Sequence, residues 1–395
     1  MTAHLPLEGI RVLDLSTFLS GPVVTRALAD LGAEIIKIEP PTGDPTRAGT
    51  AMSAGEPPSY FWMALHRDRK SVVLDLKSAA GRGVMLELVA GADVLVENFR
   101  PGVMDRFKLG PDELRAANAR LISCSITGFG PDGPIADQVA IDGPVQAFSG
   151  LVELSDRLGF AQRPLPMTVA DIAGASAASQ SILAALFARE RGGSGCHIDI
   201  SLFEALLQWL SVADRTGSLA PPVTQILEGS DGGVMLVQTP MHFQTRLLEL
   251  VGTVPGFEEF ASDARFANKE GIQEHAAEYT ATLRRAVASR PRAEWLGLLQ
   301  AAGIPAAPIN TLDEALDHPQ LAHRHAVTDL EVPGCEITRV VLGPFRFDGA
   351  RRSETMPPPT LGQDTATVLE TMLGYDAKRL AALAAEGAFG RPSAG

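Results

Sequence analysis

The chain has 395 residues, of which 45% are hydrophobic and 21% charged, a balance typical of a folded globular protein with a large core. Its formal net charge of −13 at pH 7 argues against binding to nucleic acid or to an anionic membrane surface. The N-terminal residues lack the basic and apolar regions of a signal peptide, and we predict a soluble protein with no membrane partner and no membrane-spanning run.

Short apolar runs alternate with helical stretches over the first part of the chain. We predict strands at residues 11–15, 34–38, 71–76, 93–96 and 121–126, separated by helices at residues 21–31, 80–90 and 111–119. This alternation predicts a parallel sheet covered by helices on both faces. The fold class is therefore α/β, with a Rossmann-like large domain over residues 1–205 that includes a long helix of small residues at 173–190.

The pattern changes after residue 205. The sequence of residues 206–226 predicts a linker made of a helix and a Pro-rich loop. Residues 227–325 combine a hairpin-like start at 230–237 with several helices, which predicts a second, smaller α+β domain. The C-terminal residues 326–395 contain a predicted strand at 339–342 and predicted helices at 364–373 and 376–386.

A single carboxylate, Asp171, precedes the long helix of small residues. A carboxylate at a helix start accepts backbone N–H bonds and is favoured by the helix dipole, so we expect Asp171 to stay ionised. In a cleft, such a group serves as a nucleophile or a base. The alternative is an ordinary N-cap aspartate.

Basic residues gather next to the predicted strands of the sheet. The run from His66 to Lys70 leads into the strand at 71–76, and Arg100 and Arg106 follow the strand at 93–96. Ligands of parallel sheets bind beyond the carboxyl ends of the strands, where Arg and Lys suit phosphates. A solvated charged face is the alternative for any one of them. The side chains of Asn98 and Phe99 suit an adenine ring, to which they would offer an amide and an aromatic face. They are equally typical of an amide that caps a strand and of a phenylalanine in the core.

Other kinds of site are disfavoured. The first βα turn, 16–22, lacks the G-x-G-x-x-G pattern, so a nicotinamide cofactor is not expected even though Glu39 closes the second strand. The eight histidines form no metal-ligand set, and there is no G-x-S-x-G serine elbow. Three scattered cysteines favour a reducing, cytoplasmic setting.

Segments that follow one another in a fixed order along nearly the whole chain together match the sequence pattern of a known family. They include the segments 7–15, 30–40, 43–47, 70–77, 94–102, 126–130, 303–308 and 359–365. With these segments the chain resembles the class III CoA-transferase family, which also includes the α-methylacyl-CoA racemases.

The resemblance implies a catalytic aspartate and a CoA site. The aspartate matches Asp171, and acyl-CoA is the implied substrate, with no metal. It further implies an interlocked homodimer, in which residues 326–395 return to complete the large domain. We expect the N–H groups at the start of the 173–190 helix to stabilise an oxyanion. The implied CoA contacts are Leu19, Ser20, Leu74, Asp75, Leu76, Lys77, Asn98, Phe99, Arg100 and Arg106.

Two departures from the family pattern bear on the reaction. Ile141 stands where a racemase has a second base, a histidine, so CoA transfer through an aspartyl intermediate is favoured over α-proton transfer. Leu19 replaces a glutamine of the oxalate- and formate-type transferases, which makes an oxalate-like acceptor doubtful and suggests an apolar acyl pocket. A racemase or isomerase, and a catalytically idle CoA-binding relative, are the alternatives.

Overall fold

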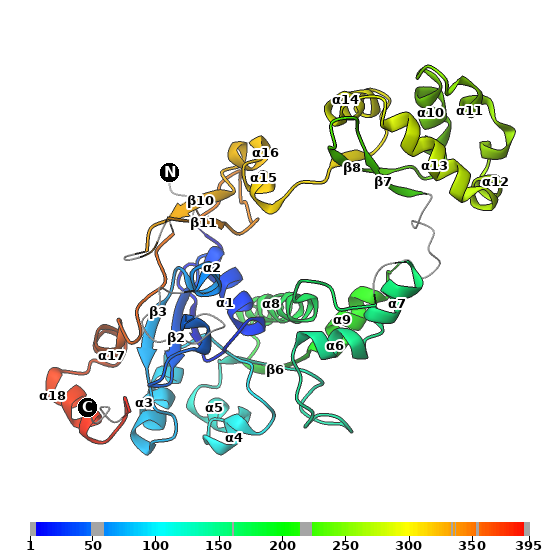
Figure 1. Ribbon diagram of the computed structural model, residues 1–395. Helices are drawn as coiled ribbons and strands as arrows, with labels where there is room; N and C mark the ends of the chain where they lie inside the picture. Colours follow the sequence, from blue (N-terminus) through cyan, green and yellow to red (C-terminus); the bar gives the residue numbers. More distant parts are fainter. Residues whose placement is uncertain are drawn as a thin grey trace. The chain divides into compact units, whose positions relative to one another are not determined.

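A computed structural model describes residues 5–48, 59–159, 162–213, 223–332, 335, 337–352 and 355–390. The chain divides into two compact units (Figure 1). Unit 1 comprises Met1–Val152, Arg163–Ser211 and Gln320–Gly395, and unit 2 comprises Glu153–Gln162 and Val212–Pro319. Residues 214–222, in the predicted linker, lie outside the described residues. The predicted domain boundaries themselves stay a prediction.

Unit 1 is built on a six-stranded sheet with the order β3-β2-β1-β4-β5-β6. All five pairings between neighbouring strands are parallel, which confirms the predicted α/β fold. The sequence reasoning missed the sixth strand, although its alternation of His, Ile, Asp and Ile is a strand signal. The strands are β1 (Arg11–Asp14), β2 (Glu34–Glu39), β3 (Lys70–Val73), β4 (Val94–Glu97), β5 (Ile122–Thr127) and β6 (Cys196–Ser201).

Helices cover both faces of this sheet because successive strand residues point to opposite sides. Val12 belongs to one hydrophobic core, shared with α1, α8 and α9, whereas Leu13 belongs to the other, shared with α3, α5, α17 and α18 (Figure 1). The helices of unit 1 are α1 (Ser20–Asp30), α2 (Tyr60–His66), α3 (Ala79–Ala90), α4 (Val103–Arg106), α5 (Pro111–Ala117), α6 (Asp142–Phe148), α8 (Val169–Glu190), α9 (Leu202–Leu210), α17 (Thr365–Leu373) and α18 (Ala377–Ala385), with the 3-10 helix η1 (Pro45–Ala48).

The helix α8 packs against strands β5 and β6 and against helix α9. A small residue allows its close approach to α9, since a Cβ atom at Gly174 would lie 2.3 Å from the side chain of Leu202, the first residue of α9. Contrary to the sequence prediction, this 22-residue helix is long and apolar enough to cross a membrane by length and composition. Its residues Ala178, Ile182 and Leu186 are buried in the core of unit 1, and a core helix of a soluble protein passes the same test.

The C-terminal residues of unit 1 close the open edge of β3. The Asp364 carboxylate accepts the Ser71 N–H at 2.8 Å, and the Thr365 hydroxyl accepts the Val73 N–H at 3.1 Å. A separate antiparallel pair, β10 (Val327–Leu330) and β11 (Thr338–Val341), packs against α2.

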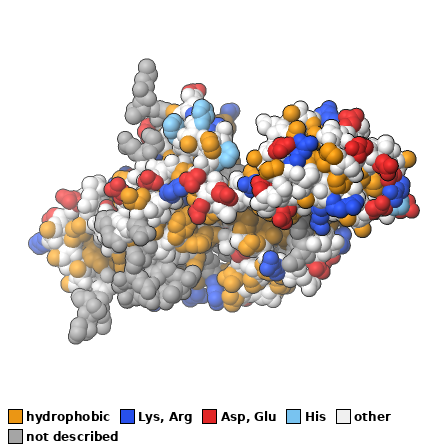
Figure 2. Space-filling view, turned by 45° about the horizontal axis from the view of Figure 1, so that its top comes forward, with side chains coloured by type: hydrophobic (Ala, Val, Ile, Leu, Met, Phe, Trp, Pro, Cys, Tyr) orange, Lys and Arg blue, Asp and Glu red, His pale blue; other side chains and the backbone are white. Residues whose placement is uncertain are grey.

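Unit 2 holds a three-stranded antiparallel sheet of order β7-β8-β9 with helices around a core that includes Tyr279 and Trp295. Figure 2 shows acidic and basic side chains interspersed on the face of unit 2 that it presents. Its elements are β7 (Thr224–Glu228), β8 (Val234–Gln238), α10 (Met241–Gly252), α11 (Glu258–Ser262), η2 (Ala264–Phe266), α12 (Lys269–Glu274), α13 (Ala276–Val287), α14 (Arg292–Ala301), β9 (Ala306–Pro308) and α15 (Leu312–Leu316). The helices α7 (Leu151–Arg157) and α16 (Pro319–His323) span unit boundaries.

Candidate active site

The sheet order places a switch point between β1 and β4. From β1 the chain continues to β2 on one side, and β4 lies on the other. Loops that leave the carboxyl ends of two such strands diverge, and the crevice between them is where open α/β sheets bind ligands. The loop after β1 carries Leu19 and Ser20, and the loop after β4 carries Asn98, Phe99 and Arg100.

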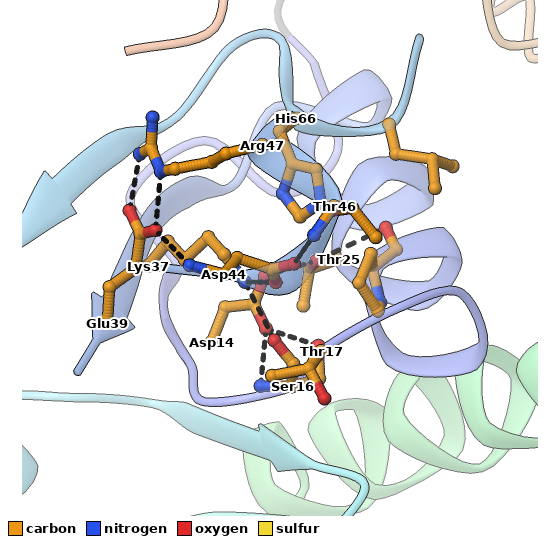
Figure 3. Close-up of polar contacts among 12 residues, drawn as sticks. Asp14, Ser16, Thr17, Thr25, Lys37, Glu39, Asp44, Thr46, Arg47 and His66 are labelled. Carbon is orange, nitrogen blue, oxygen red and sulfur yellow. Dashed lines mark hydrogen bonds and ion pairs between the residues drawn. The ribbon is translucent and has the colours of Figure 1, made fainter. Parts of the chain in front are cut away.

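The loop after β1 rests on a buried polar cluster (Figure 3). Asp14 accepts hydrogen bonds from the Ser16 backbone N–H at 2.9 Å and the Thr25 hydroxyl at 2.8 Å. It also forms an ion pair with Arg69 at 2.8 Å. Burial disfavours the charged carboxylate, but Lys37 and Arg69, together with the hydrogen bonds from Ser16 and Thr25, outweigh this and hold the pKa of Asp14 below its ordinary value. The loop after β1 is thus held in place by buried charged side chains that neutralise one another.

The basic run before β3 belongs to this scaffold, so the prediction that it binds phosphate is wrong for its arginines. Arg67 and Arg69 are 1% and 4% exposed. Arg67 pairs with Asp30 at 2.7 Å, and also with Asp68. Guanidinium groups enclosed in this way are not open to a ligand, because their charge is already paired inside the fold.

Asn98 joins the two loops at the switch point. Its side-chain oxygen accepts the Thr17 N–H at 2.8 Å, and its amide nitrogen donates to the Thr17 carbonyl at 2.8 Å. The same nitrogen lies 3.1 Å from the Ser20 hydroxyl oxygen. Gly21 permits the close packing of α1 against the loop, since a Cβ atom there would lie 2.1 Å from the Ser16 side chain. The Asn98 side chain is therefore used to hold the β1–α1 loop.

Asp171 lies in the first turn of α8 but does not cap it, so the N-cap interpretation is wrong. The N-cap residue is Thr168, which makes no side-chain cap bond. The cap comes instead from Asp142 in α6, whose Oδ1 accepts the N–H groups of Ala170 at 2.7 Å and Asp171 at 3.3 Å. The next N–H, of Ile172, bonds to the Thr168 carbonyl. These N–H groups are occupied and do not form the oxyanion site that we expected.

The expectation that Asp171 stays ionised also fails. Burial, together with the negative charge of Asp142, raises the pKa of Asp171 from 3.8 to about 7, opposed by a hydrogen bond from Ser20. The carboxyl group is therefore about half ionised at neutral pH. The sequence reasoning missed two residues of this site, Asp142 and Gln146. The Gln146 side-chain amide donates a hydrogen bond to the Asp142 carboxylate at 2.5 Å. Their i,i+4 spacing at a helix start was the available signal.

Ile141 immediately precedes this capping carboxylate. Its side chain is 68% exposed, and it is the N-cap residue of α6. A hydrocarbon side chain cannot carry a proton, so Ile141 itself cannot act as a base.

The remaining predicted CoA contacts lie around the carboxyl ends of β3 and β4. Leu74 is buried, Asp75 and Leu76 are half-buried, and Lys77 is exposed. These residues contact α3 and the C-terminal segment, since the Asp75 N–H bonds to the Ala388 carbonyl and Arg82 donates to the Lys77 carbonyl. Phe99 packs edge-on against Phe107. A hydrogen bond thus joins Asn98 to Ser20, and the Ser20 hydroxyl acts to lower the pKa of Asp171, whereas the others are assigned by the resemblance alone.

Three exposed cations stand out among these residues. Lys77, Arg100 and Arg106 are solvent-exposed, and none forms an ion pair with any residue that the structure describes. Within the same described part of the chain, no group of three or more His, Cys, Asp or Glu residues is placed to hold a metal ion.

Residues 7–365 match the sequence profile of CoA-transferase family III. The chain belongs to this family. It is 36% identical to the acetyl-CoA:oxalate CoA-transferase of Acetobacter aceti, over 81% of this chain and 85% of the relative. It is 33% identical to an acyl-CoA transferase of Fusarium pseudograminearum, over 95% of this chain and 86% of the relative. The structure of a CAIB/BAIF family protein from Brucella suis superposes with a TM-score of 0.80 at 30% identity, over 94% of this chain and 100% of the other. The protein is thus an enzyme of the family III CoA-transferases.

Proposed function

We propose that this family III CoA-transferase moves CoA from an acyl-CoA thioester to a carboxylic acid, with Asp171 as the nucleophile. The observation that carries the proposal is the Asp171 carboxyl group in the first turn of α8, a helix that packs against α1, which follows the switch-point strand β1. Ile141 stands where the resemblance places the second base of a racemase, and a hydrocarbon side chain cannot act as a base. A nucleophile whose pKa is about 7 is more basic than an ordinary aspartate and is still half ionised at neutral pH.

The reaction divides into four acyl exchanges. The Asp171 carboxylate attacks the thioester carbonyl, which gives a mixed anhydride and CoA thiolate. The thiolate attacks the aspartyl carbonyl, which releases the donor acid and leaves an aspartyl-CoA thioester. The acceptor carboxylate attacks this thioester and re-forms an anhydride and thiolate, and the thiolate then takes the acceptor acyl group and frees Asp171. Each step exchanges one activated acyl bond for another, so no external energy source is needed.

The exposed cations suit the anionic end of the substrate. We place the CoA phosphates near Lys77, Arg100 and Arg106, because these charges have no internal partner among the described residues. Leu74, Asp75, Leu76, Asn98 and Phe99 belong to the same proposed CoA site, with Leu19 and Ser20 next to the thioester. The exposed Ile141 supports an apolar acyl group, so we expect longer or aromatic acids to be better acceptors than oxalate.

Replacement of the nucleophile tests the proposal. Asp171→Ala is expected to abolish transfer while the far-UV circular dichroism spectrum stays unchanged. In the wild-type protein, incubation with acyl-CoA followed by peptide mass spectrometry is expected to find a covalent adduct on Asp171. Substantial transfer by Asp171→Ala, with Asp112→Ala as an exposed control, would contradict the assignment.

Racemisation or isomerisation is the second candidate, because a carboxyl group with a pKa of about 7 also suits a general base. Ile141 argues against it. Exchange of solvent deuterium into the α-carbon of an acyl-CoA, without added acceptor, distinguishes the two reactions, since transfer requires no such exchange.

We also propose a cytoplasmic homodimer, as the family resemblance implies. Large apolar side chains exposed along α8 and α9, including Phe187 and Trp209, support a protein interface. Light scattering coupled to size-exclusion chromatography tests the dimer, and a monomeric mass would contradict it.

A further inference from the structure

We infer that Glu97 is a positioning residue for CoA binding, whose buried carboxyl group accepts the Phe99 N–H and fixes the turn at residues 98–100. The inference rests on the CoA site that is part of the proposed function. Glu97 is not among the CoA contacts that the family resemblance implies. Its task is to shape the turn that carries three of those contacts, without touching CoA itself.

Glu97 lies at the point where β4 ends and the turn begins. It is the last residue of the strand and is 5% exposed. Its Oε2 atom accepts the backbone N–H of Phe99, two residues further along the chain, at 2.7 Å. Within the sheet, Glu97 is in register with Ser125 of β5. The hydrogen bond therefore ties the backbone of the turn to a strand that is held inside the sheet.

The turn carries groups on which the proposed CoA site depends. The side chain of Asn98 holds the β1–α1 loop through the N–H and the carbonyl of Thr17, both at 2.8 Å. Arg100 is exposed, and its carbonyl accepts the Val103 N–H at 3.1 Å, at the start of the short helix α4 that ends at Arg106. A shift of the turn would therefore move the amide and the two cations together.

The environment of Glu97 is costly for the fold, which a purely structural role does not explain. Burial raises the pKa of Glu97 from 4.5 to about 7, against the hydrogen bonds from Ser125 and from the Phe99 N–H. The charged groups that act on it are Asp105 and Asp199, both acidic, and no described residue forms an ion pair with it. Acids with such perturbed pKa values cluster at functional sites.

The test compares two substitutions of nearly equal size. Glu97→Gln keeps an oxygen that accepts the Phe99 N–H, whereas Glu97→Met fills the same space with a thioether, which is a weak acceptor. Methionine adapts to buried positions, so both variants are expected to fold. By isothermal titration calorimetry, free CoA is expected to bind Glu97→Gln within about twofold of the wild type and Glu97→Met about tenfold more weakly.

The rate of transfer gives a second measurement on the same two variants. At saturating acyl-CoA, kcat is expected to change by less than about twofold in either variant, while KM for acyl-CoA rises in Glu97→Met alone. The reason is that α8, and not this turn, carries Asp171.

Asp93→Ala is the matched control, because it weakens contacts at the opposite end of β4. The Asp93 carboxylate accepts the Arg11 N–H at 2.9 Å and pairs with Arg189 at 2.8 Å. Its removal is expected to lower the free energy of unfolding in urea, since Arg189 is left buried without its partner. The affinity for free CoA is expected to stay within about twofold of the wild type, since the turn keeps its hydrogen bond to Glu97.

Equal affinities for CoA in Glu97→Gln and Glu97→Met would overturn the inference, as would an equal weakening in Asp93→Ala. The proposed function is tested separately by Asp171→Ala, which removes the nucleophile and not the turn. If Glu97→Met binds CoA weakly but Asp171→Ala still transfers, the positioning role stands and the proposed nucleophile fails. If Asp171→Ala is inactive but Glu97→Met binds CoA as the wild type does, the nucleophile stands and the positioning role fails.

Discussion

Two groups of buried or half-buried carboxylates in unit 1 differ in how their charge is balanced. Beneath the loop after β1, Asp14 meets Arg69, and Asp30 meets Arg67. At the start of α8, Asp142 and Asp171 lie near each other, and no cation acts on Asp171 among the described residues. The first group has matched charges and serves as a scaffold. The second has two like charges, which makes one carboxyl group easy to protonate and unusually basic.

The largest expected effect comes from breaking the matched group. Arg69→Met leaves Asp14 buried without its guanidinium partner, and we expect a loss of about 3–5 kcal/mol in the free energy of unfolding. Urea denaturation measures it. The control is Arg115→Met, whose exposed pair with Asp112 at 3.9 Å is expected to contribute less than about 1 kcal/mol. Equal losses of unfolding free energy in Arg69→Met and Arg115→Met would show that the buried ion pair stabilises the fold no more than the exposed one.

In the group of like charges, the ionised form of Asp171 is expected to destabilise the folded state, whereas the paired charges of the first group stabilise it. Well below pH 3.8 Asp171 is protonated in both the folded and the unfolded chain, so its environment costs no stability. As the pH rises from 3.8 to about 7, the unfolded chain ionises first and the folded state loses stability, with no further loss above about pH 7. Asp171→Asn, which cannot ionise, is therefore expected to gain stability over the wild type across this window, by up to about 4 kcal/mol. Thermal unfolding at pH 5 and pH 8 measures the gain, and a gain independent of pH would contradict it.

The smallest expected effect comes from a substitution within the Asp142–Asp171 pair itself. Asp142→Asn removes the like charge but keeps an oxygen for the Ala170 N–H. We expect the midpoint of the kcat/KM profile to fall by about one pH unit, because the like charge that raises the pKa of Asp171 is removed. Asp112→Asn, an exposed change in α5, serves as the control. A midpoint that rises in Asp142→Asn would show that Asp142 acts on Asp171 through something other than its charge.

The sequence predicts the α/β fold well because strands buried on both faces are short apolar runs, as in Val94–Glu97. It also singles out Asp171. It does not reveal that Arg69 is buried, because a run of charged residues is typical of a surface and the partner, Asp14, lies 55 residues away. It also left the N-cap role of Asp171 open as an alternative, because Asp142, the residue that caps this helix, reaches it only through the packing of α6 on α8.

The bonds from Asp364 and Thr365 to β3 have a consequence for biosynthesis. Strand β3 is at the edge of the sheet, and these two residues satisfy the backbone N–H groups of Ser71 and Val73. These two residues follow their partners in β3 by 293 and 292 residues, so during translation the edge stays open until a long intervening stretch of chain has been made. An open strand edge is a template for pairing with other chains. A nascent chain stalled before residue 364 therefore presents an unprotected edge, which makes the segment at Asp364 and Thr365 a safeguard against aggregation.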